Sequence, residues 1–137
     1  MKYALIGCGR ISRNHIKAAV NNGLDFVAVC DILPEAMEAR LEEADLSKKD
    51  SIHRYTDYIT MLDTEKPDFV SIATESGLHA GIALDCIDRG VNVIIEKPMA
   101  TSLADADEMI PCLPQAMRMR VRDTPRYRRF RTGDRRR

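Results

Sequence analysis

Short apolar runs alternate along the chain with segments whose apolar residues recur every three or four positions. The short runs, rich in valine and isoleucine, are predicted to be strands at about residues 3–6, 24–31, 68–74 and 91–95, with a further short strand at 51–55. The periodic segments between them are predicted to be helices at about residues 12–22, 34–44, 57–62, 79–89 and 102–110. Strands that alternate with helices are typical of parallel βαβ units with right-handed crossovers. The pattern therefore predicts an α/β fold, a Rossmann doubly wound parallel sheet.

Two local features of this pattern predict which residues are buried. Ile16, Ala19 and Val20 fall on one side of the first predicted helix, so they are expected to face the sheet. The runs at 70–72 and 93–95 show almost no alternation of apolar and polar residues. Such runs predict strands that are covered on both faces.

The regular pattern stops at Pro111, where the charge of the chain also reverses. Residues 1–110 hold 11 Lys and Arg against 19 Asp and Glu, whereas residues 111–137 hold 10 Arg against 2 Asp. Pro111 and Pro114 are predicted to stop the last helix. We therefore expect an incomplete Rossmann domain over residues 1–110 and a disordered Arg-rich tail over 111–137. A sudden change to Arg, Pro and Met is also typical of GC-rich DNA read out of frame, which would make the chain truncated.

The composition excludes several other classes of protein. No apolar run approaches the roughly 20 residues that span a bilayer, and the chain opens on a strand rather than a signal peptide. A cytoplasmic protein with no membrane partner is therefore expected. The cysteines lie far apart and form no CxxC pair, which favours reduced apolar side chains over disulfides or a metal site: Cys8, Cys30, Cys86 and Cys112.

The first predicted strand runs into a glycine-containing turn, and the second ends at Asp31. Gly7 would permit a tight turn, and Gly9, without a Cβ, would let a pyrophosphate approach the backbone. The helix that begins near Ser12 would point N–H groups and its positive dipole end at the phosphates. Asp31 lies at the spacing of an acid that binds ribose hydroxyls. The pattern predicts a dinucleotide site, with an adenosylmethionine site or a turn without ligand as alternatives.

Polar residues also follow the later predicted strands. Ligands of open α/β sheets bind at the carboxyl ends of the strands, so Thr74, Glu96 and Lys97 are expected to share a crevice with the glycine turn. A lysine in that crevice could exchange a proton with a substrate hydroxyl or carbonyl beside a nicotinamide ring. Burial would lower the pKa of its amine toward neutrality.

Together these motifs resemble the glucose–fructose oxidoreductase and inositol dehydrogenase family (Gfo/Idh/MocA). The resemblance covers residues 1–110 and rests on the glycine turn with His15, on Asp31, on Ala73-Thr74 followed by His79, and on Glu96-Lys97-Pro98-Met99-Ala100. It implies NAD or NADP as cofactor and a sugar, cyclitol or sugar nucleotide as substrate. It also implies that Lys97 takes part in catalysis and that the cofactor is bound by Gly7, Gly9, Arg10, Ile11, Asp31, Thr74, His79, Glu96 and Lys97.

The chain departs from that family in two respects. Glu75-Ser76-Gly77 follow Thr74 where the family often has Pro and Asn, and no second, substrate-carrying α/β domain is recognisable. We expect substrate binding only if such a domain is supplied, and poor activity without it. Asp31 is followed by no Lys or Arg, which favours NAD over NADP. Two alternatives stay open: a stand-alone dinucleotide-binding subunit, and a module whose Arg tail binds nucleic acid, which the acidic body disfavours.

Overall fold

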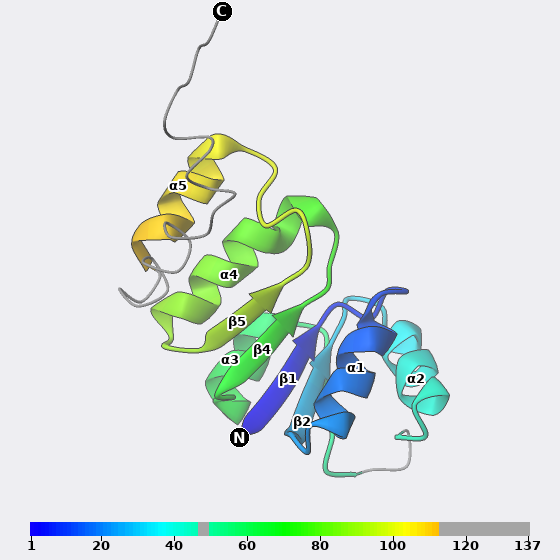
Figure 1. The fold of residues 1–137 in the computed structure, drawn as a ribbon. Coiled ribbons are helices and arrows are strands. Elements are labelled where there is room, and N and C mark those ends of the chain that lie inside the picture. The colour runs from blue at the N-terminus through cyan, green and yellow to red at the C-terminus, as the bar shows by residue number, and fades with distance from the viewer. Residues whose placement is uncertain (47–49, 113–137) are drawn as a thin grey trace, which may run out of the picture.

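The computed structural model describes residues 1–46 and 50–112, and its centre is one sheet of five parallel strands in the order β3-β2-β1-β4-β5 (Figure 1). The strands are β1 Lys2–Ile6, β2 Asp25–Cys30, β3 His53–Tyr55, β4 Phe69–Ile72 and β5 Asn92–Ile95. The register places Ile6 opposite both Cys30 and Ile72, and Ile72 opposite Ile95. Because each of these residues ends its strand, the loops that follow leave the sheet at one edge. This strand order is that of the Rossmann fold, so the predicted fold class is confirmed.

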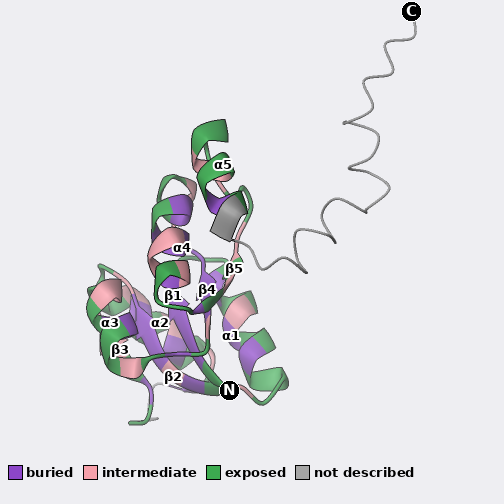
Figure 2. Ribbon diagram, turned by 90° about the vertical axis from the view of Figure 1, so that its left-hand side faces the viewer, coloured by how far each residue is buried: buried purple, intermediate pink, exposed green. Residues whose placement is uncertain are grey.

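Helices cover both faces of this sheet (Figures 1 and 2). The helices are α1 Ser12–Asn21, α2 Pro34–Glu43, α3 Tyr58–Glu65, α4 His79–Asp88 and α5 Leu103–Cys112, with a short 3₁₀ turn η1 at Ser76–Leu78. Leu5 of β1 packs in a core with residues of α1 and α2, whereas Ile6 packs in a second core with residues of α3, α4 and α5. Successive residues of a strand point to opposite faces, so β1 contributes to both cores.

Polar residues begin two of the helices, as their sequences predict. The side chain of Asp57 accepts a hydrogen bond from the N–H of Thr60 at 2.9 Å, and Ser102 Oγ accepts one from the N–H of Asp105 at 3.1 Å. Each bond satisfies an N–H that has no partner within its own helix. Pro34 occupies the first position of α2, where its missing N–H costs nothing.

Three of the local predictions are wrong. Val20 is 51% exposed, because the buried face of α1 is centred on Ser12, Ile16 and Ala19, and Val20 lies about 80° around the helix from it. Helix α5 includes Pro111 and ends at Cys112, so Pro111 does not stop it at residue 110.

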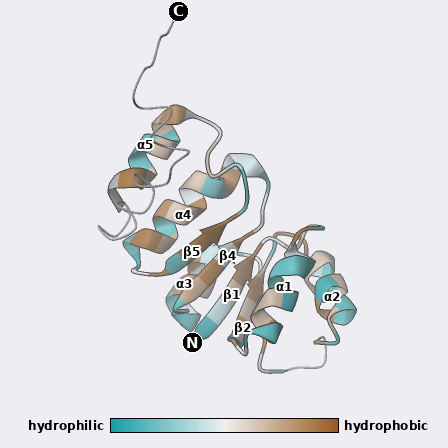
Figure 3. Ribbon diagram, viewed as in Figure 1, coloured by the Kyte–Doolittle hydropathy of each residue, from teal (hydrophilic) through white to brown (hydrophobic). Residues whose placement is uncertain are grey.

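The third wrong prediction concerns β5, which is not covered on both faces. Val93 and Ile95 are half-buried against α4, whereas Ile94 on the opposite face is 48% exposed. The helices of that face, α1 and α2, pack beside β1, β2 and β3 rather than β5. Figure 3 shows the hydrophobic residues of β5 at this edge of the sheet. The prediction of a disordered tail lies, beyond Cys112, outside the described residues.

Candidate functional site

The turn that follows β1 passes against the backbone that follows β4. Gly7 has φ +94°, and a Cβ built there would lie 2.6 Å from the carbonyl carbon of Ala73 and 2.6 Å from the nitrogen of Thr74. Only glycine fits both this backbone conformation and this contact. The N–H of Gly7 donates to the carbonyl oxygen of Cys30 at 2.8 Å, which ties the turn to the end of β2.

Two residues further on, the same turn is open. A Cβ built on Gly9 would meet nothing within 4 Å, and Gly9 lines a cavity. The buried hydroxyl of Ser12 donates to the carbonyl oxygen of Gly9 at 2.5 Å, and this bond ties the turn to the first residue of α1. Helix α1 begins at Ser12 without a side-chain cap from Ile11, and the N–H groups of Ser12 and Asn14 donate to the carbonyl oxygens of Gly9 and Ile11. The positive end of the helix dipole lies at this turn. This cradle fits the pyrophosphate of a dinucleotide.

Asp31, directly after β2, is held by two backbone N–H groups. Its Oδ2 accepts a hydrogen bond from the N–H of Cys8 at 2.7 Å, and its Oδ1 accepts one from the N–H of Leu33 at 2.9 Å. Each carboxylate oxygen keeps a further lone pair for a ligand hydroxyl. Burial, followed by the charge of Asp31, raises the pKa of the Cys8 thiol to about 12. Cys8 is therefore a neutral, buried side chain under the site.

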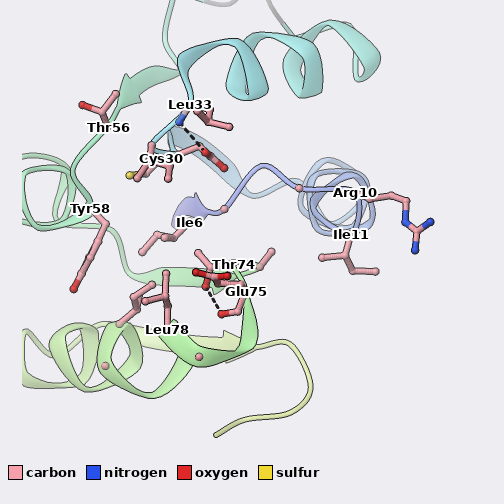
Figure 4. A pocket seen from close by; sticks show the side chains of 18 residues that line it. Ile6, Arg10, Ile11, Cys30, Leu33, Thr56, Tyr58, Thr74, Glu75 and Leu78 are labelled. Atoms are coloured by element: carbon pink, nitrogen blue, oxygen red, sulfur yellow. Dashed lines mark hydrogen bonds between the residues drawn. The ribbon is translucent and has the colours of Figure 1, made fainter. Parts of the chain in front are cut away.

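These elements enclose a cavity of about 720 Å³, which is within the usual range for small-molecule sites (Figure 4). It extends from the glycine turn past the loop after β2 to the loop after β4. In Figure 4 the side chain of Arg10 extends away from Thr74 and Glu75, so the turn meets the cavity largely through its backbone. Of the residues predicted for cofactor binding, the lining includes Gly7, Gly9, Arg10, Ile11, Asp31 and Thr74.

His79, the first residue of α4, lies outside this lining and is only 1% exposed. Its Nδ1 lies 2.8 Å from the carbonyl oxygen of Pro98, and its Nε2 lies 3.0 Å from the carbonyl oxygen of Thr74. A neutral imidazole can donate to one of these carbonyls, whereas a ring with a proton on each nitrogen donates to both. The ring therefore joins the loop after β4 to the loop after β5.

Glu96 and Lys97 begin the loop after β5, and neither lines the cavity. The N–H of Glu96 donates to the carbonyl oxygen of Ile72 at 3.1 Å, and its Oε1 lies 2.9 Å from His15 Nε2. Lys97 itself is exposed. The burial that was expected around its amine is therefore not supplied by the described residues.

Two contacts of the site were missed at the level of sequence. His15 was expected only to pack near the glycine turn, yet it meets Glu96, which lies 81 positions away. Arg40 of α2 donates from Nε to the carbonyl oxygen of Cys8 at 3.2 Å, and this bond connects the glycine turn to α2. Neither contact has a local signal, since both depend on how separate elements pack.

Three further observations on the described residues concern metal sites, membrane helices and cysteines. Within residues 1–46 and 50–112 no cluster of His, Cys, Asp and Glu could hold a metal ion. None of the helices described is long and apolar enough to cross a membrane. The cysteines whose side chains are described are free and buried: Cys8, Cys30 and Cys86.

A parallel sheet in this order, with a glycine turn and an acid at its carboxyl edge, defines the class of dinucleotide-binding Rossmann domains. Residues 1–121 match the Gfo/Idh/MocA oxidoreductase family, described as "Oxidoreductase family, NAD-binding Rossmann fold". The chain belongs to that family and carries its NAD-binding domain. The resemblance inferred from the motifs is confirmed.

Curated relatives agree with this assignment. The chain is 37% identical to D-apiose dehydrogenase of Paraburkholderia graminis over 116 residues, which is 84% of this chain and 30% of that protein. It is 30% identical to inositol 2-dehydrogenase of Salmonella typhimurium over 112 residues, which is 80% of this chain and 32% of that protein. The chain thus spans about a third of the length of these relatives.

Two solved structures are similar to this chain in fold as well as in sequence. The WlbA dehydrogenase of Bordetella pertussis, in complex with NADH and UDP-GlcNAcA, is 34% identical and has a TM-score of 0.72. The match covers 82% of this chain and 34% of that one. The myo-inositol dehydrogenase of Lactobacillus casei, in complex with NAD(H) and myo-inositol, is 31% identical with a TM-score of 0.72, over 82% of this chain and 32% of that one.

Proposed function

We propose that this chain is the nucleotide-binding half of an NAD-dependent oxidoreductase that acts on a sugar, cyclitol or sugar nucleotide. The observation that carries the proposal is the open cradle at Gly9 beside an Asp31 whose two oxygens are fixed by backbone N–H groups. The relatives support the substrate class, because one is a D-apiose dehydrogenase, others act on inositols, and one was solved with a sugar nucleotide.

The roles of the binding residues follow from their positions. The backbone at Gly9 to Ile11 and the N-terminus of α1 hold the pyrophosphate, while Asp31 accepts hydrogen bonds from the ribose hydroxyls. A fixed carboxylate would repel the 2′-phosphate of NADP, so NAD is the preferred cofactor. Thr74, beside Gly7 at the cavity wall, contacts the dinucleotide between these two parts.

The bound nicotinamide supplies hydride transfer, and Lys97 moves the proton. Lys97 lies in the loop after β5, at the same sheet edge as the glycine turn, where its amine can take or return the proton of a substrate hydroxyl. Glu96 and His79 support that loop from either side. Since the amine is exposed and lies beyond the cavity, turnover requires a surface that holds substrate against it, and the chain alone is poorly active.

A titration of the purified 137-residue chain with NADH, followed by NADH fluorescence, tests the proposal. The chain has no Trp, so protein emission does not interfere. We expect saturable binding, with at least about a tenfold weaker affinity in Gly9→Val, whose side chain fills the cradle. Ala104→Val, which adds bulk at an exposed position of α5, is the matched control and should bind like the wild type. A folded wild-type chain that shows no binding at millimolar NADH would contradict the proposal.

A further inference from the structure

The loop after β5 is contacted on both sides of Lys97 by histidines from two different helices. His15 of α1 places Nε2 2.9 Å from Glu96 Oε1, and His79 at the start of α4 places Nδ1 2.8 Å from the carbonyl oxygen of Pro98. The two contacts therefore fall on the residues directly before and after the lysine. They join positions that are 81 and 19 residues apart, so they follow from the packing of the helices and not from local geometry.

Both contacts are shielded from water. The His79 ring is almost fully buried and also reaches the carbonyl oxygen of Thr74, so one side chain holds two loops together. The side chains of His15 and Glu96 are 13% and 27% exposed. Hydrogen bonds in such surroundings compete with little water, and losing one partner leaves the other poorly solvated.

The Lys97 side chain, by contrast, has no such contact within the described residues. It is exposed, and its amine has no hydrogen-bond partner among residues 1–46 and 50–112. The backbone of the loop is attached to the sheet through the bond from the N–H of Glu96 to the carbonyl oxygen of Ile72. The other contacts that hold the loop within these residues are the two histidine contacts and the packing of Ala100 against the core of α3, α4 and α5.

We propose that His15 and His79 are positioning residues, which fix the loop of residues 96–98 and thereby set where the amine of Lys97 lies. The proposal rests on the proposed function of Lys97. His15 also sits one turn into the helix that begins at the glycine turn. It therefore connects the pyrophosphate cradle to the lysine loop, and dinucleotide binding should make that loop more rigid.

Amide hydrogen exchange of the full chain tests the positioning directly. In His15→Leu and in His79→Leu, which remove the ring nitrogens, exchange at the amide of Glu96 should be about five- to tenfold faster, as expected for one hydrogen bond lost from a local opening. Exchange in β1 should stay unchanged, since that strand is at the centre of the sheet. Added NADH should slow exchange at Glu96 in the wild type and slow it less in His15→Leu at equal occupancy.

The third histidine offers a matched control. His53 Nδ1 lies 2.7 Å from Glu65 Oε1, so it makes the same kind of contact, but it belongs to β3 and is 58% exposed. His53→Leu should leave exchange at the Glu96 amide unchanged. Relative to its intrinsic exchange rate, Glu96→Leu should match His15→Leu, and the double variant should be no faster than either single one, because each removes the same interaction.

Every outcome of these exchange measurements either supports or contradicts the positioning role of the two histidines. If loop exchange in His15→Leu and Glu96→Leu equals that of the wild type, or rises only together with β1, the histidines are not positioning residues. If His79→Leu does not fold, the His15 and Glu96 variants give the answer alone. Exchange without NADH needs no ligand, so a wild-type chain that fails to bind NADH contradicts the proposed function, whereas unchanged loop exchange with intact NADH binding contradicts only the positioning role.

Discussion

The middle of the sheet's carboxyl edge and its β5 end differ in how far the described residues complete them. In the middle, after β1 and β2, Gly7 touches the β4 loop, Asp31 is bonded through both oxygens, and these residues line a cavity of about 720 Å³. At the β5 end, Lys97 is exposed, and Ile94 on the face of α1 and α2 is 48% exposed.

The difference shows that holding a dinucleotide and reacting with it have separate structural requirements. The cradle is made from backbone N–H groups and one acid, all within 31 residues of the N-terminus, so a single βαβ unit can build it. An active lysine needs water excluded and a substrate held close, which requires a covering surface.

The largest effect is expected for Lys97→Ala. In a chimaera where residues 1–110 replace the matching region of D-apiose dehydrogenase, turnover should fall about 10²- to 10⁴-fold, as is typical when a general acid–base group is lost. Binding of NADH should change little, because Lys97 lies outside the cavity. Steady-state kinetics and a parallel NADH titration measure both. Near-normal turnover would remove Lys97 from the chemistry.

The next largest effect separates the two glycines of the turn. Gly7→Ala should destabilise the fold by about 3 kcal/mol, because a Cβ would overlap the backbone of Ala73 and Thr74 at a positive φ. Gly9→Ala should leave the free energy of unfolding within about 0.5 kcal/mol and weaken NADH binding, since its Cβ meets only open space. Urea unfolding of both variants gives the free energies. Equal stability of the two variants would contradict the packing assigned to Gly7.

A smaller effect is expected for the charge at Asp31. Asp31→Asn keeps an oxygen for the N–H of Cys8 and removes the charge, so the preference for NAD over NADP should fall about tenfold. Asp31→Ala also leaves the N–H groups of Cys8 and Leu33 without their acceptors, and should cost about 2 kcal/mol of stability. Titrations with NADH and NADPH, together with urea unfolding, distinguish the two roles. An unchanged preference in Asp31→Asn would show that another residue selects the cofactor.

The smallest effect concerns Cys8, the buried thiol beneath Asp31. Because burial first and Asp31 second raise its pKa to about 12 in the folded chain, the folded state keeps the proton that an unfolded thiol loses near pH 9. Its contribution to stability is therefore fully present below pH 9 and lost as the pH rises toward 12, with about 1 kcal/mol gone by pH 10. Urea unfolding at pH 8 and pH 10 should show a smaller decline in Cys8→Ala. The same decline in both chains would mean that Cys8 does not titrate between the two states.

The sequence predicts most of the fold because its signals are local. Gly7 occupies the predicted tight turn, and the helices capped by Asp57 and Ser102 begin within a residue of the predicted starts. Asp31 could be found in the same way, because its distance from the glycine turn is set by one βαβ unit. The positions of Thr74 and Lys97 at the ends of strands also follow from strand order.

The remaining features depend on which elements pack together. Ile94 lies in an apolar run, which predicts that it is buried. Only the placement of α1 and α2 shows that it is exposed. His15 meets Glu96 across 81 positions, and no periodicity in either segment encodes that pair. Nor does the sequence show that Asp31 supports the turn as well as facing the cavity.

The central place of β1 has a consequence for how the chain is made. Tyr3 pairs with Phe26 on one side and with Phe69 on the other, and the second partner is synthesised 66 positions later. At roughly 5–20 residues per second of synthesis, β1 waits about 3–13 s for that partner. During this interval a strand that is buried from Tyr3 to Ile6 in the finished protein has one unpaired edge, which makes the nascent chain a substrate for chaperones before it is a ligand-binding domain.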